Sequence, residues 1–257
     1  GRLLYWHGRA LEKRKKTIAA AKKVYTEVIV DFPVSFYSAM AEERLLRLDP
    51  AALTAARKTA QAKKGGEPLS ERVATMLKQP DVARAIELTR LGLRSFARAE
   101  LGRMAGRGKA DQDWLLAYLY DRAANHNKAY KIARFSRGEY AQRYPSESNR
   151  EEWTIAHPRP AVFERSVKAA ARAHGIDEAL VWAIMRSESG FKPTAHSFAN
   201  AMGLMQLIMP TAKSMARKEG ISGSITRERL EKPDLNIRLG SRYLGQLARR
   251  FDGHPAL

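Results

Sequence analysis

The sequence has no cysteine, which excludes disulfide scaffolds, thiolate zinc sites and catalysis by a thiol. The absence does not fix the compartment, because proteins of oxidising compartments need not carry disulfides. No apolar run approaches the roughly 18–20 residues that a membrane helix needs. The six histidines lack a ligand spacing, and no Gly-x-Ser-x-Gly or Walker-type loop occurs. We therefore expect no metal and no cofactor.

Acidic residues are few: 27 Asp and Glu stand against 46 Lys and Arg, giving a formal net charge of +19. Such a charge concentrates anionic partners of any kind, including nucleic acid, anionic lipid and acidic cell-wall polymer. Much of it stands in runs such as EKRKK and ARKTAQAKK, which are typical of the solvated outer faces of helices. A basic helical-repeat protein that binds nucleic acid or an acidic partner therefore stays open as one function.

The fold class is predicted to be all-α, because Ala, Leu, Arg, Lys and Glu dominate and alternating strand patterns are rare. Helix pairs closed by a proline turn recur faintly in residues 1–152, as in stacked, superhelix-like hairpin repeats. Residues 49–70, which include the Gly65-Gly66 pair, are predicted to form a loose linker within this region.

A domain boundary is predicted near Trp153, in a stretch with three prolines and clustered polar residues. Residues 153–257 then form a second helical domain. Its first predicted helix stops at Gly175, and the next begins with Asp177 as N-cap. Gly190 is placed just past the end of that second helix.

One glutamate, Glu188, stands at the end of the apolar run VWAIMRSES. Val181, Met185 and Glu188 follow one another at spacings of four and three, so Glu188 is expected on the apolar stripe of its helix. Burial and the negative end of the helix dipole would both favour a protonated carboxyl, which describes a general acid. The alternative is a glutamate at a frayed helix end that reaches solvent.

The sequence that follows Glu188 limits the glycosidase mechanisms that are possible. No Asp or Glu occurs from Ser189 to Lys218, so this segment lacks the carboxylate pair that most glycosidases use. The stretch GLMQ follows, from Gly203 to Gln206. Its glycine lets the backbone approach a ligand, and its glutamine amide can donate and accept hydrogen bonds.

The stretches SESGF, SFANAMGLMQL, PTA and DLNIRLGSRYL resemble the catalytic domain of the soluble lytic murein transglycosylases. The upstream helices resemble the superhelical region that precedes this domain in larger members. The resemblance implies a lysozyme-like α-helical domain that acts on peptidoglycan glycan strands in the bacterial periplasm. It leaves room for outer-membrane or cell-wall association, implies no nucleic acid, and leaves the oligomeric state open. Glu188 matches the sole catalytic acid, and the residues that match the lining of the sugar cleft are Ser189, Gly203, Leu204, Met205 and Gln206.

The family cleaves the β-1,4 bond between N-acetylmuramic acid and N-acetylglucosamine and forms a 1,6-anhydromuramic product. The resemblance implies that Glu188 protonates the leaving oxygen and then takes the proton of the muramic C6 hydroxyl as it attacks C1. A muramidase that hydrolyses the same bond stays open, because the residues do not separate the two reactions.

Three departures from the family pattern stand out. Asn200 replaces a glycine, although Asn also tolerates left-handed backbone. Pro210 stands one residue later than usual. The chain opens without an initiator Met and stops at RRFDGHPAL, before an Ala-Tyr-Asn motif of the family. The chain is therefore predicted to be truncated at both ends, with a partial catalytic domain of little or no activity.

Overall fold

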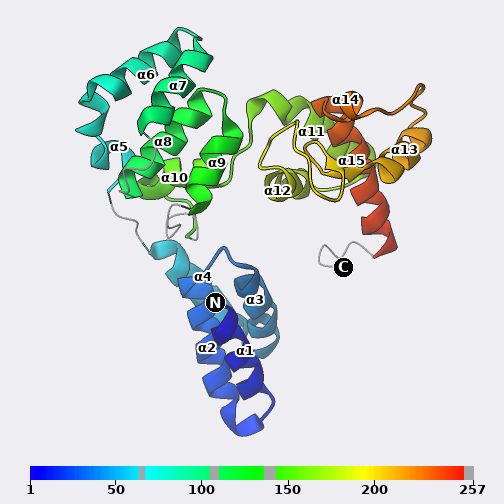
Figure 1. The fold of residues 1–257 in the computed structure, drawn as a ribbon. Coiled ribbons are helices and arrows are strands. Elements are labelled where there is room, and N and C mark those ends of the chain that lie inside the picture. Colours follow the sequence, from blue (N-terminus) through cyan, green and yellow to red (C-terminus); the bar gives the residue numbers. More distant parts are fainter. Residues whose placement is uncertain (64–66, 105–109, 136–142, 252–257) are drawn as a thin grey trace. The chain divides into compact units, whose positions relative to one another are not determined.

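A computed structural model describes residues 1–63, 67–104, 110–135 and 143–251. These residues are mostly helical, and within them the strands form one short antiparallel pair (Figure 1). The chain divides into two compact units: Gly1–Leu119 with Ile132–Ala156, and Tyr120–Lys131 with His157–Leu257. The all-α prediction is thus confirmed. Tyr120–Lys131, which the sequence placed with the repeats, belongs to the second unit.

No helix among the described residues has the length and apolar character to cross a membrane.

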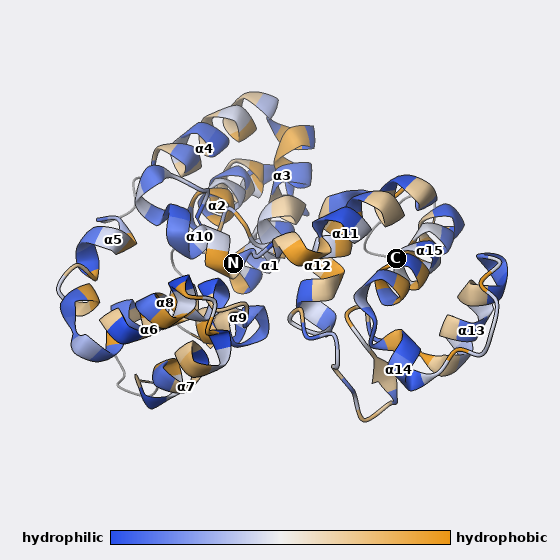
Figure 2. Cartoon of the chain, turned by 90° about the horizontal axis from the view of Figure 1, so that it is seen from above, coloured by the Kyte–Doolittle hydropathy of each residue, from blue (hydrophilic) through white to orange (hydrophobic). Residues whose placement is uncertain are grey.

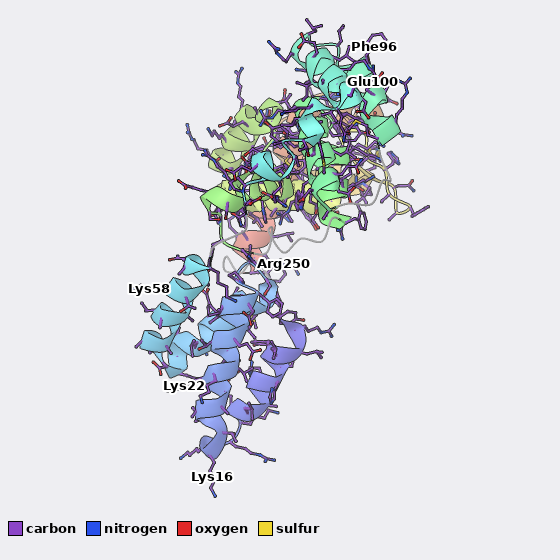
Figure 3. The ribbon with its side chains drawn as sticks, turned by 90° about the vertical axis from the view of Figure 1, so that its left-hand side faces the viewer. Lys16, Lys22, Lys58, Phe96, Glu100 and Arg250 are labelled. Atoms are coloured by element: carbon purple, nitrogen blue, oxygen red, sulfur yellow. The ribbon has the colours of Figure 1, made fainter. Side chains whose placement is uncertain are left out.

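The first unit consists of short helices that pack against neighbours in the chain, as helical hairpin repeats do. Its helices are α1 (Arg2–Glu12), η1 (Lys15–Thr17), α2 (Ile18–Asp31), α3 (Phe36–Leu48), α4 (Pro50–Ala62), α5 (Leu69–Arg72), η2 (Met76–Lys78), α6 (Pro80–Arg90), α7 (Arg94–Met104), α8 (Ala110–Arg122), the end of α9 (His126–Phe135), η4 (Glu147–Asn149) and α10 (Arg150–Ala156). Lys16 and Lys58, from the two basic runs, are exposed as predicted (Figure 3).

The first three helices are joined through Glu12 at the end of α1. Its carboxylate accepts hydrogen bonds from Tyr25 Oη at 2.7 Å and from Arg44 Nε at 3.1 Å. The hydrogen bonds from Arg44 hold the pKa of Glu12 below its usual range. Glu12 therefore ties α1 to α2 and α3 above a core that includes Tyr5, Tyr25 and Leu45.

The predicted linker at residues 49–70 is wrong for most of its length, because Pro50–Ala62 is helix α4. Asp49 caps this helix by accepting a hydrogen bond from Ala52 N at 3.0 Å, and Pro50 occupies its first position. An Asp-Pro pair is a helix start as readily as a chain break. Its inner face is buried and consists of Leu53, Ala56 and Ala60. The Gly65-Gly66 pair lies outside the described residues.

The second unit carries five helices and the strand pair within its described residues, besides the beginning of α9 (Figure 1). They are α11 (Ala161–His174), α12 (Glu178–Glu188), β1 (Ala201–Met202), β2 (Leu207–Ile208), α13 (Met209–Lys218), α14 (Arg227–Leu230) and α15 (Pro233–Arg250). The core between α11, α12 and α15 includes Phe163, Val167, Val181, Met185 and Ile237. Figure 2 shows the apolar residues of α12 as an orange stretch.

The helix ends of this unit follow the local sequence. Gly175 ends α11 with a left-handed φ of 64°, and the Asp177 carboxylate caps α12 by accepting a hydrogen bond from Ala179 N at 2.7 Å. Both ends were predicted, because glycine and aspartate are the residues that these two positions favour.

A charged cluster joins α11, α13 and α15 around Glu219. Its carboxylate accepts hydrogen bonds from Arg238 Nε and Arg242 Nη1, both at 2.5 Å, and lies 3.5 Å from His174 Nε2. Burial acts to raise the pKa of Glu219, but the two arginines outweigh it and hold the pKa below its usual range. Burial also lowers the pKa of His174, against the opposing pull of Glu219.

The cluster predicts how the stability of the second unit depends on pH. A group whose pKa is lower in the folded than in the unfolded state stabilises the fold above its unfolded pKa and loses this contribution on acidification. For His174 the loss begins below about 6.5, and for Glu219 below about 4.3. The H174Q variant is therefore expected to lose less stability than wild type between about pH 7 and 5. Hydrogen exchange of α11 and α15 across this range measures the effect, and equal losses in both proteins would contradict it.

Candidate active site

Glu188 is the last residue of α12, and its side chain is exposed. The expectation that apolar surroundings bury Glu188 is therefore wrong. Val181 and Met185 on the same stripe are buried, but the chain leaves the helix after Glu188 and folds back. Phe191, which is 3% exposed, then fills the core beside Met185 and Trp182. The next apolar position of the stripe is thus taken by Phe191 and not by Glu188.

The turn after Glu188 is closely hydrogen-bonded. Ser189 Oγ donates to the Met185 carbonyl at 2.9 Å and accepts from Phe191 N at 3.1 Å. Gly190 and Phe191 have φ values of 55° and 64°. A left-handed phenylalanine costs on the order of 1–3 kcal/mol and persists only where its surroundings hold it. Contacts with the rings of Trp182 and Tyr130, at centroid distances of 6.2 and 6.5 Å, supply that support.

The GLMQ stretch is the loop of the β1–β2 hairpin. Its first residue, Gly203, has a φ of 79°, and a Cβ there would lie 2.2 Å from Asn236 Nδ2, so only glycine fits. Gln206 is also left-handed, and its Nε2 donates to the carbonyls of Ala195 at 3.2 Å and Gly203 at 3.0 Å. Both amide hydrogens are thus engaged. Among the described residues no group donates to Gln206 Oε1.

Leu204 and Met205 lie in the core, at 0% and 6% exposure. Their side chains share one core cluster with Met185 of α12. Any contribution of these two residues to a bound sugar would have to come from the backbone. Their packing has a different consequence: it holds the hairpin loop against the apolar stripe of α12. Met185, three residues before Glu188 in α12, is thus the point at which this helix shares a core with the loop.

Asn236 of α15 holds the hairpin loop, and it is not among the residues predicted for the site. It is fully buried, accepts a hydrogen bond from Met205 N at 2.8 Å, and donates to the carbonyls of Met202 at 3.0 Å and Leu230 at 2.9 Å. The sequence does carry a sign of this role, because Asn236 stands on the buried stripe of an amphipathic helix. A buried amide needs hydrogen-bond partners, so such a position indicates a structural contact.

The loop between the two motifs forms a second tight turn. Asn200 N donates to the Ser197 carbonyl at 3.0 Å, and Asn200 has a φ of 58°. The prediction that asparagine replaces glycine in a left-handed position is thereby confirmed. Phe198, in this turn, is fully exposed at 111% of its reference area, and Ile208 on β2 is 43% exposed.

Of the site residues predicted from the sequence, Glu188 alone carries a carboxyl group. Among the described residues Glu188 forms no ion pair or side-chain hydrogen bond. The described residues also include no group of three or more His, Cys, Asp and Glu side chains that could hold a metal. Such an arrangement can give and take a proton at one point, whereas chemistry with two carboxylates would need a second acid.

Residues 165–257 match the family Transglycosylase SLT domain. The second unit thus carries an SLT domain, and Glu188 and the GLMQ loop lie inside it. This confirms the resemblance that the motifs indicated.

Curated lytic transglycosylases are similar to part of this chain. Membrane-bound lytic murein transglycosylase C of Salmonella paratyphi B is 45% identical over 82 residues, which are 32% of this chain and 23% of that protein. The same enzyme of Klebsiella pneumoniae is 46% identical over 82 residues, with the same two shares. The chain thus spans less than a quarter of the length of these curated relatives.

Two solved structures match nearly the whole chain. Lytic transglycosylase Slt of Pseudomonas aeruginosa, an inactive mutant in which a glutamate is replaced by glutamine, has a TM-score of 0.68 and 25% identity. That match covers 98% of this chain and 37% of the other. The 70 kDa soluble lytic transglycosylase of Escherichia coli has a TM-score of 0.67 and 20% identity, over 98% of this chain and 36% of the other. The fold of both units is therefore that of the soluble lytic transglycosylases.

Proposed function

We propose that this chain forms part of a lytic transglycosylase that cleaves the β-1,4 bond between N-acetylmuramic acid and N-acetylglucosamine in peptidoglycan. The observation that carries the proposal is the placement of Glu188. It is an exposed carboxyl at the end of α12, and it forms no ion pair within the described residues. Met185 of the same helix shares a core cluster with Leu204 and Met205 of the GLMQ loop, and both segments lie in the SLT match. In the Pseudomonas relative a glutamate-to-glutamine mutant is inactive, which supports an essential glutamate carboxyl in such an enzyme.

Glu188 would act twice in this reaction. As an acid it gives its proton to the glycosidic oxygen, the bond from that oxygen to muramic C1 breaks, and the N-acetylglucosamine end leaves with a hydroxyl. As a carboxylate it then takes the proton of the muramic C6 hydroxyl while that oxygen bonds to C1. The proton returns to Glu188, and no water is consumed. The substrate's own acetamido group would stabilise the positive charge at C1, in place of a second carboxylate.

An exposed carboxyl suits a polymeric substrate, because the bound glycan itself can cover Glu188 and exclude water. Gln206 Nε2 donates both of its hydrogens to loop carbonyls. Gln206 Oε1 has no donor within the described residues and can accept a hydrogen bond from a sugar hydroxyl or amide. The exposed ring of Phe198 offers an apolar surface to a sugar face. We assign binding roles to Ser189 and Gly203 through the loop backbones that they shape.

The charge of the chain is consistent with a periplasmic location at the cell wall, where peptide stems carry carboxylates. Sedimentation with purified sacculi should then weaken as salt rises. Equal or stronger retention on DNA would favour a basic nucleic-acid-binding protein instead.

Mass spectrometry of digested sacculi tests the reaction. The wild-type protein and its E188Q variant are incubated with sacculi. New muramic ends in the 1,6-anhydro form are the expected result for the wild-type protein. New reducing ends would make the enzyme a muramidase, and the absence of any cleavage by the wild-type protein would overturn the enzymatic proposal.

A further inference from the structure

The beginning of α9 lies far upstream of the SLT domain in the sequence but belongs to the same compact unit. Two local contacts fix it. Asp121 Oδ1 lies 2.7 Å from His126 Nδ1, and Asn125 caps the helix by accepting a hydrogen bond from Lys128 N at 3.2 Å. Asn127, in the first turn, is therefore presented from a well-defined helix start.

Asn127 contacts the turn that follows Glu188. Its Nδ2 donates to the Ser189 carbonyl at 3.0 Å and to the Gly190 carbonyl at 3.1 Å. Both hydrogens of the amide are therefore used on two successive carbonyls, the first two after Glu188. A Cβ on Gly190 would lie 2.9 Å from the same nitrogen, so α9 and the turn are fitted closely together.

The turn needs an external support. Carbonyl groups at a helix C-terminus have no partner within the helix. Two consecutive left-handed residues, Gly190 and Phe191, then reverse the chain. Phe191 adopts this conformation at a cost, and such conformations persist only where the surroundings hold them. Two residues of α9 support this turn. The Asn127 amide donates hydrogen bonds to its carbonyls, and the Tyr130 ring packs edge-on against Phe191.

We propose that Asn127 is a positioning residue for Glu188. Its amide fixes the direction in which the chain leaves α12, and with it the orientation of the carboxyl toward the hairpin loop. The catalytic site of this protein is then completed from outside the SLT domain, by a segment of the preceding helical region. The inference rests on the proposed function insofar as Glu188 is the residue that reacts.

Two alanine variants on α9 test the proposal. N127A removes the contact with the turn, whereas K128A shortens an exposed side chain of the same helix and leaves that contact in place. We expect N127A to lower kcat about ten- to a hundred-fold with KM changed less than about two-fold, because misplacing a reacting group mainly slows the chemical step. K128A should leave kcat within about two-fold. Equal losses of kcat in both variants, or no loss in N127A, would overturn the proposal.

The pH profile of N127D separates positioning from simple loss of stability. The new carboxylate would face two carbonyl oxygens, whereas its protonated form can donate a hydrogen bond to one of them. The activity of N127D relative to wild type should therefore rise as the pH falls from about 8 to 5. A constant ratio across this range would count against a role for the donated hydrogen bond.

The placement of the turn can be tested without any activity. In amide NMR spectra, N127A should shift the signals of Ser189, Gly190 and Phe191, and K128A should leave them in place. Unshifted signals in N127A would overturn the inference even if the wild-type protein cleaves glycan. Absence of cleavage by the wild-type protein, with the signals shifted as expected, would overturn the proposed function and leave the contact of Asn127 with the turn standing.

Discussion

Replacing Glu188 by glutamine is expected to slow glycan cleavage about a thousand-fold, within the range that one acid–base residue contributes. The amide cannot protonate the leaving oxygen or accept the proton of the C6 hydroxyl. Stability should change by less than about 0.5 kcal/mol, because exposed side chains away from special features contribute little to folding. Glu188 is exposed and unpaired within the described part of the chain.

The matched control is E178Q, the same substitution at the other end of α12. Glu178 stands in the first turn, where its negative charge interacts favourably with the helix dipole and stabilises the helix by roughly 0.3–1 kcal/mol. E178Q should therefore lose slightly more stability than E188Q and keep the cleavage rate. Release of soluble muropeptides measures the rate, and urea denaturation measures the stability. Cleavage by E188Q at the wild-type rate would remove Glu188 from the mechanism.

Replacing Asn236 by alanine is expected to destabilise the second unit by about 3–5 kcal/mol. The substitution leaves Met205 N and the carbonyls of Met202 and Leu230 without their buried partner. Because these groups belong to the hairpin and to the end of α14, the GLMQ loop should lose its fixed conformation. Denaturation followed through amide NMR signals of the hairpin measures the loss.

Ser241 supplies the control on the same helix. It is also fully buried, but its Oγ has no hydrogen-bond partner among the described residues. S241A should therefore leave stability unchanged within about 0.5 kcal/mol or raise it slightly, because it removes an unsatisfied polar group. A loss below about 1 kcal/mol in N236A would show that the asparagine does not hold the loop.

The local sequence was sufficient to predict the backbone conformation at positions where a single residue type determines it. Gly175, Asp177, Gly190 and Asn200 all stand where the sequence placed a helix end, a cap or a left-handed turn. These positions depend on the conformational range of one residue and on hydrogen bonds within a few positions of it. They are therefore readable without knowledge of the tertiary fold.

The features that depend on tertiary packing were not readable. Helical spacing placed Glu188 on the apolar stripe, but it could not show that Phe191 returns to fill the core. The contact between Asn127 and Ser189 joins residues 62 positions apart, and neither residue type signals it. The linker prediction relied on the Gly65-Gly66 pair and overlooked the Asp49-Pro50 pair, which is a helix-start signal and begins α4.

Digestion of sacculi in ¹⁸O-labelled water tests most directly whether Glu188 passes a proton between two oxygens of the substrate. If the C6 hydroxyl attacks C1, the new muramic ends are anhydro sugars without label, and E188Q forms none of them. Label at new reducing ends would mean that water attacks C1, and this result would contradict the account.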